Sequence, residues 1–135
     1  MPVLWDEKYS VKVTELDNQH KKLFDIINKL DSHMRQGKGK EILGSVLKDM
    51  VDYTKVHFAA EERILRDSGY PDYDQHKAIH EKVTAKVSTI HSKYLEGNGS
   101  RLSIEAMNYL NDWLQKHILG TDQKYSSHLN GNGLV

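Results

Sequence analysis

Seven histidine, aspartate and glutamate side chains in this sequence fall at spacings that would gather them at one end of a helical bundle. Imidazole nitrogens and carboxylate oxygens are common ligands of transition metals. Two pairs lie four residues apart, in HFAAE (57–61) and HKAIH (76–80), so each pair shares one helix face. The pattern predicts a metal site formed by His20, His57, Glu61, His76, His80, His117 and Asp122.

A hydrogen-bonded structural cluster is the alternative interpretation of these residues. A single core histidine is more often structural than a metal ligand, and one HxxxH pair is a weak signal. Here, however, each ionisable residue interrupts an otherwise apolar helical stripe, and buried ionisable groups are costly unless they are paired or coordinated. This favours a metal centre. By the same criterion, His33 and His91 should lie on the surface, His128 in the tail, and Glu62 in solvent.

The number and type of ligands indicate two ions and oxygen chemistry. One zinc ion needs about four ligands, which makes seven too many. Two ions could share the carboxylates, with three histidines on one ion, two on the other and one position open. Imidazole suits iron, copper, nickel and zinc. In a di-iron site, five neutral imidazoles and two carboxylates would favour the ferrous state and reversible oxygen binding over oxygen–oxygen cleavage. The neighbouring apolar residues are core by default and could also wall the site: Leu23, Phe24, Phe58, Trp113 and Leu114.

Apolar residues recurring every three or four positions predict four helices, at about 17–36, 40–67, 71–95 and 103–119. Asp17 and Ser103 are possible N-caps, Gly69 suits the residue after a helix end, and Pro71 suits a first helical turn. Short loops make neighbouring helices antiparallel, so the predicted fold is an all-α, up-down-up-down four-helix bundle. That topology brings all the predicted ligands to one end.

Asp122 is the ligand that helical spacing explains least well. It follows His117 by five residues, so a regular helix would turn it away from that histidine. A wide turn at Gly120 could return Asp122 to the site.

The chain is predicted to be one domain, 1–135, with two irregular ends. Residues 1–16 should form an extended arm over the bundle, anchored by a buried Trp5. Residues 126–135 have little to pack with and should be a loose tail.

Composition narrows the class of protein. The 19 basic and 19 acidic residues balance, which argues against a nucleic-acid partner. The absence of cysteine excludes disulfides and thiolate metal sites. The sequence shows neither a signal peptide nor an apolar run long enough to cross a membrane, so we expect a cytoplasmic protein.

The ligand motifs together resemble those of the hemerythrin family, in its single-domain bacterial form (bacteriohemerythrin). The resemblance rests on LDNQH around His20, on HFAAE, on HKAIH, on HILGTD at 117–122, on the GYPD turn at 69–72 and on Trp5. It extends from Trp5 to about Tyr125 and implies a non-heme di-iron centre. By resemblance, His76, His80 and His117 would bind an iron whose coordination sites are all occupied. His20 and His57 would bind the second iron, which would have one vacant coordination site. Glu61, Asp122 and an oxo or hydroxo group would bridge them, with Leu114 over the oxygen pocket and Phe58 and Trp113 in its wall.

The leading hypothesis is therefore reversible dioxygen binding for storage or delivery, by a protein that is not an enzyme. An oxygen-consuming protein is a possible partner. Two alternatives use the same ligands: a di-iron enzyme that scavenges peroxide or nitric oxide or oxidises ferrous iron, and an oxygen or iron sensor module.

Overall fold

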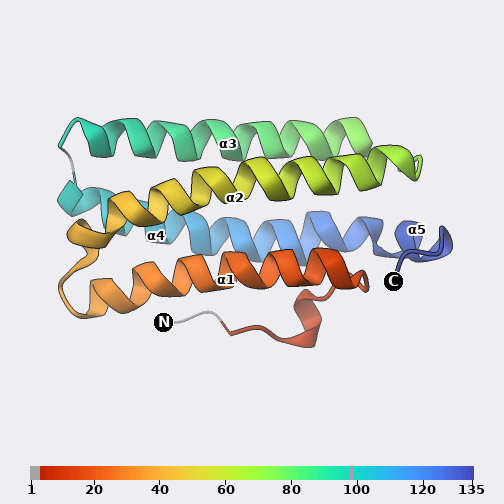
Figure 1. Ribbon diagram of the computed structural model, residues 1–135, viewed down its shortest axis with the longest axis horizontal. Helices are drawn as coiled ribbons and strands as arrows, with labels where there is room; N and C mark the ends of the chain where they lie inside the picture. The colour runs from red at the N-terminus through yellow and green to blue at the C-terminus, as the bar shows by residue number, and fades with distance from the viewer. Residues whose placement is uncertain (1–3, 98) are drawn as a thin grey trace.

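The computed structural model describes residues 4–97 and 99–135. Four long helices lie side by side and alternate in direction (Figure 1): α1 (Thr14–Arg35), α2 (Gly39–Asp67), α3 (Tyr73–Leu95) and α4 (Gly99–Lys116). α1 and α3 each contact both α2 and α4. The predicted all-α, up-down-up-down bundle is confirmed. No helix in the described ranges is long and apolar enough to cross a membrane.

Several helix boundaries differ from those predicted. α1 begins at Thr14, so the arm ends at residue 13 rather than 16. Asp17 does not cap the helix; its carboxylate accepts hydrogen bonds from the Ser10 hydroxyl (2.6 Å) and the Val11 amide (2.8 Å), and thereby ties the arm to α1. α4 begins at Gly99, which leaves Ser103 inside the helix, and α3 begins at Tyr73, after Pro71.

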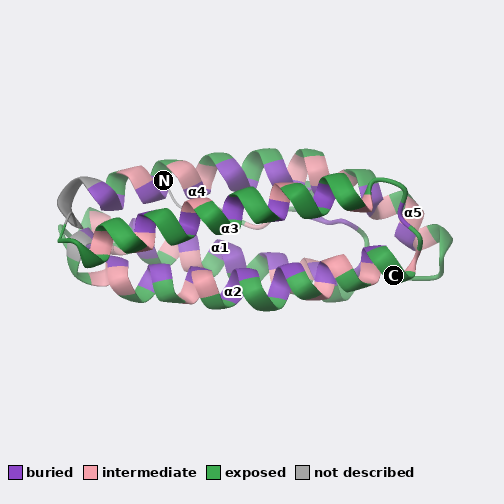
Figure 2. Ribbon diagram, turned by 90° about the horizontal axis from the view of Figure 1, so that it is seen from above, coloured by how far each residue is buried: buried purple, intermediate pink, exposed green. Residues whose placement is uncertain are grey.

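Each long helix buries one face against the others (Figure 2). The main core cluster runs through the bundle and includes Leu30, Met50, Val87 and Leu110. A second cluster, here called the end cluster, consists of Val11, Val13, Leu16, Leu65, Tyr70, Tyr125 and Leu129. Its residues come from the arm, α1, the end of α2 and the C-terminal segment, so it joins both ends of the chain.

The end of α2 shows how local sequence shapes the end cluster. Gly69 adopts a left-handed conformation (φ 72°), which glycine reaches without steric cost. Its amide bonds to Arg66 and the next amide, of Tyr70, bonds to Leu65, which together form a Schellman motif. The motif turns the chain so that Tyr70 packs with Leu65 in the end cluster. The predicted role of Gly69 is confirmed.

The N-terminal arm contains a short 3-10 turn, η1 (Glu7–Tyr9), and is otherwise extended. Trp5 is only partly buried, contrary to prediction, with its ring centroid 5.4 Å from that of Phe24 and 6.0 Å from that of Tyr9. The arm therefore covers part of α1 with aromatic contacts.

The prediction of a loose tail after residue 125 is wrong. Residues Ser126–Gly131 form a short helix, α5, whose Leu129 is fully buried. The Ser126 hydroxyl donates to the Val11 carbonyl (2.6 Å), and His128 Nε2 lies 2.9 Å from the Ser68 carbonyl. α5 packs at the end of the bundle because Leu129 is buried there and because the polar side chains of Ser126 and His128 bond to carbonyls of distant segments.

Candidate metal centre

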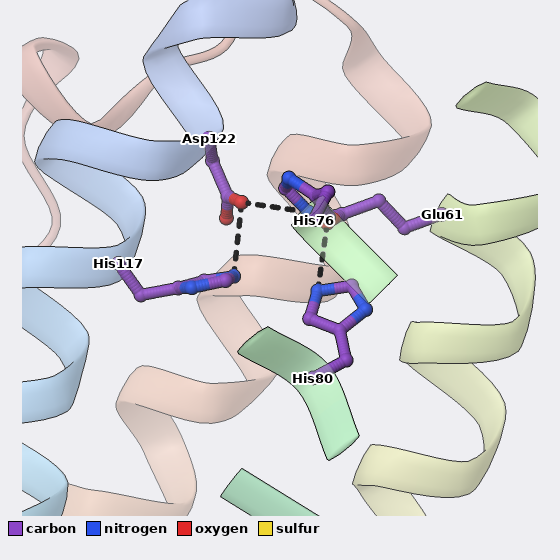
Figure 3. Close-up of side chains that lie close together, drawn as sticks. All are labelled: Glu61, His76, His80, His117 and Asp122. Carbon is purple, nitrogen blue, oxygen red and sulfur yellow. Dashed lines mark hydrogen bonds and ion pairs between the residues drawn. The ribbon is translucent and has the colours of Figure 1, made fainter. Parts of the chain in front are cut away.

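The structure brings all seven predicted ligands together in two overlapping groups. Within each group, one possible ligand atom from each residue lies within 4.8 Å of all the others. The larger group, shown in Figure 3, is Glu61, His76, His80, His117 and Asp122. The smaller group is His20, His57 and Glu61. All seven side chains are buried, with exposed fractions of 3% or less.

Four helical segments supply these side chains at the same end of the bundle. His20 lies near the start of α1, and His57 and Glu61 lie in the C-terminal half of α2. His76 and His80 lie near the start of α3. The i, i+4 spacing within α2 and α3 points both members of each pair inward. His117 follows α4 directly.

A wide turn after α4 solves the spacing problem of Asp122. Residues His117–Thr121 form a π-helical turn, η2, and the Asp122 amide donates to the His117 carbonyl, five residues earlier. Asp122 begins the 3-10 turn η3 (Asp122–Tyr125). Its Oδ1 thereby reaches 2.9 Å from His117 Nε2. The predicted irregularity around Gly120 is confirmed.

The two oxygens of Glu61 face different histidines. Oε1 contacts His76 Nε2 and lies 3.1 Å from His80 Nε2. Oε2 lies 3.4 Å from His20 Nε2 and 3.1 Å from His57 Nε2. Glu61 therefore stands between two sets of imidazoles.

The two oxygens of Asp122 also face different histidines. Its Oδ1 lies 2.9 Å from His117 Nε2 and 3.3 Å from His76 Nε2, while its Oδ2 lies 3.2 Å from His20 Nε2. The centre thus has a three-histidine half (His76, His80, His117) and a two-histidine half (His20, His57). Each half receives one oxygen from each carboxylate.

These distances fit ions better than they fit hydrogen bonds. Two ligands at right angles, each about 2.1 Å from an ion, are about 3.0 Å apart. Within the described ranges, several inward-facing atoms have no hydrogen-bond partner despite such neighbours: Nε2 of His20, His80 and His117 and both oxygens of Asp122. Buried polar atoms are nearly always partnered. The donor set therefore fits two ions that share the carboxylates.

The carboxylates are strongly held in the ionised form. Burial acts to raise the pKa of both, but contacts with the imidazoles outweigh it and keep the pKa of Glu61 well below its usual range and that of Asp122 at about 2. Burial lowers the pKa of His57. Burial also acts to lower the pKa of His20, but Asp122 and Glu61 together raise it to about 10. Without a metal, His20 therefore holds a proton between the two carboxylates.

Two polar residues outside the predicted set orient ligand imidazoles. Gln19 Oε1 contacts His57 Nδ1, and Glu62 Oε2 lies 3.0 Å from His80 Nδ1. Because both partners accept, each Nδ1 carries the hydrogen and each Nε2 keeps its lone pair for the centre. The prediction that Glu62 is solvated is wrong, since its side chain is 19% exposed. Its position beside Glu61 gives no sequence signal for this role.

A third residue that sequence reasoning missed is Tyr125. Its buried hydroxyl donates to Glu61 Oε2 at 3.0 Å. Burial and the two carboxylates raise the pKa of Tyr125 well above its usual value, so it remains a hydrogen-bond donor.

The five apolar residues predicted around the site are all buried in the main core cluster. Phe58 stacks on His80, with ring centroids 3.8 Å apart, and Trp113 stacks on His117 at 4.7 Å. Both rings thus line the three-histidine half. Leu23, Phe24 and Leu114 are each 3% exposed or less.

Comparisons with known proteins agree with this arrangement. Residues 11–129 match the family model described as the hemerythrin HHE cation binding domain. The chain is 32% identical to the bacteriohemerythrin of Stenotrophomonas maltophilia over 95% of this chain and 84% of that protein. It is also 32% identical to the bacteriohemerythrin of Methylococcus capsulatus, over 87% and 88% of the two chains. A crystal structure of wild-type hemerythrin superposes with a TM-score of 0.84 at 30% identity, covering 96% of this chain and 98% of that one.

Proposed function

The chain belongs to the hemerythrin family, and on this basis we propose that it holds two iron ions and binds dioxygen reversibly, for storage or delivery. The observation that supports the proposal most directly is the division of Glu61 and Asp122 between the two halves of the centre.

We assign one ion to the three-histidine half and one to the two-histidine half, with Glu61 and Asp122 bridging. The first ion then receives five protein ligand atoms and the second receives four. An ion in the two-histidine half would therefore be held by one protein ligand atom fewer than an ion in the three-histidine half, which would leave more room there for a small ligand. When bound, the iron pair supplies the two electrons that dioxygen accepts on binding.

The surrounding side chains suit binding better than turnover. An enzyme that reduces oxygen or peroxide needs a proton donor whose pKa lies near the working pH. The Tyr125 hydroxyl bonds to Glu61 and the Tyr53 ring stacks on His57, and burial is the largest cause that raises the pKa of each tyrosine well above its usual value. Such hydroxyls donate hydrogen bonds and keep their protons, so the proposal is a carrier and not an enzyme.

The test is anaerobic reconstitution with ferrous iron followed by exposure to oxygen. We expect two irons per chain and a visible absorption band that appears with oxygen and disappears when oxygen is removed. Irreversible oxidation without the band, or steady consumption of peroxide or nitric oxide in the presence of a reductant, would instead support a scavenging enzyme. Location in the cytoplasm and an oxygen-consuming partner stay predictions.

A further inference from the structure

One tyrosine hydroxyl beside the two-histidine half has no hydrogen-bond partner in the described part of the chain. Tyr53 lies one turn before His57 on α2, and the two rings stack with centroids 5.1 Å apart and planes 21° apart. The side chain is 9% exposed, and its hydroxyl oxygen is buried and unpartnered. A buried hydroxyl without a partner destabilises a fold, so its presence requires a reason.

Tyr125 provides an internal comparison. It is the same residue type and is also buried against the centre, but its hydroxyl is satisfied by Glu61. Within the described part of the chain, the Tyr53 hydroxyl has no such acceptor, although its ring stacks on the ligand imidazole of His57. Tyr53 therefore presents a buried hydroxyl beside His57, and no acceptor for its proton lies among the described residues.

Tyr53 lies on the wall of a surface groove. A groove of about 460 Å³ between α1 and α2 is lined by Tyr53, His57, Ile26 and Val56 and by polar and charged side chains, namely Gln19, one lysine and three aspartates. The groove thus runs along the ligand imidazole of the half that has fewer protein ligand atoms. Tyr53 and His57 are thus neighbours both in the helix and on the wall of this groove.

We propose that Tyr53 is a positioning residue whose hydroxyl donates a hydrogen bond to a small ligand, dioxygen or a small anion, held beside His57 in the two-histidine half. The inference rests on the proposed di-iron function and adds a hydrogen-bond donor to the half of the centre that has fewer protein ligand atoms. A single neutral donor would favour ligands that carry an acceptor atom within reach of the phenol.

Azide is the probe for this contact, because it is a small anion with an acceptor atom at each end. In the oxidised, iron-loaded protein, Tyr53→Phe should weaken azide binding about tenfold and shift the azide-to-iron absorption band. Tyr109→Phe is the matched control, since Tyr109 is half-buried on α4, with Lys86 over its ring, and should change neither. The iron-free Tyr53→Phe protein should melt at the same temperature as the parent or higher, because no protein hydrogen bond is lost.

Equal azide affinity and an unshifted band in Tyr53→Phe would overturn the inference. A marked fall in the melting temperature of iron-free Tyr53→Phe would also overturn it, because the hydroxyl would then serve the fold. If the parent protein takes up no iron pair or gives no azide band, the proposed function itself fails, and this inference fails with it.

Discussion

Replacing Glu61 with alanine tests whether one carboxylate serves both halves of the centre. Each half would lose one ligand atom, leaving four protein ligand atoms in the three-histidine half and three in the two-histidine half. Loss of even an outer-shell partner costs 10- to 100-fold in metal affinity, so loss of a shared ligand should cost more than about 100-fold in each half. We expect fewer than two irons per chain after reconstitution.

The bundle itself should survive this change. In the iron-free protein, Glu61→Ala leaves the protonated His20 with Asp122 as its remaining carboxylate contact. Breaking a buried pair costs about 3 kcal/mol, against a total stability of about 5–15 kcal/mol for such domains. For a chain of this size, that loss lowers the melting temperature by about 10 °C.

Iron content by chemical assay and helicity by circular dichroism measure the two effects separately. Glu81→Ala is the control, because Glu81 is exposed and follows His80 directly, and it should load two irons. If the alanine variant does not fold, Glu61→Gln keeps the side-chain size and removes the charge. A folded Glu61→Ala protein that binds two irons with parental affinity would refute the bridging role.

Three further predictions concern the surroundings of the centre. Tyr125→Phe removes the hydrogen bond to Glu61 Oε2 and should destabilise the iron-free protein by about 1.5 kcal/mol, a fall of about 5 °C in thermal melts; an unchanged melt would mean that the bond contributes nothing. The pKa of His20 is about 10 in the iron-free protein, so iron must displace a proton from His20 at any lower pH. The apparent iron affinity should therefore fall at least tenfold for each pH unit below that value. Competition with a chelator at two pH values would measure the slope. Leu129→Ala should cost about 2–4 kcal/mol in chemical denaturation because the side chain is fully buried, whereas a freely moving C-terminal segment would show almost no loss.

The ligands could be predicted because they violate a pattern. His57, Glu61, His76 and His80 occupy inward positions of apolar stripes, and such residues are costly there without a partner or an ion. The helices follow from the same periodicity, and antiparallel packing follows from short loops. The predicted helix boundaries are less accurate than the predicted helices themselves. The start of α1, for example, depends on the hydrogen bonds of Asp17 to the arm, and helical spacing does not predict such contacts.

The residues that support the ligands break no pattern, which is why the sequence did not reveal them. Gln19 and Glu62 are polar residues at positions that a helix could equally well expose. The aromatic ring of Tyr53 suits an inward position of an apolar stripe, so the sequence does not indicate that its hydroxyl is buried without a partner in the described part of the chain.

Tyr125 and Leu129 lie in a segment too short and too polar to predict a packed helix. They are buried because Ser126 and Asn130 bond to carbonyls of the arm, more than 100 residues earlier in the chain. The apolar stripes of the helices therefore predict which side chains can bind metal. Contacts between the two ends of the chain determine which residues cover the end of the bundle around Glu61.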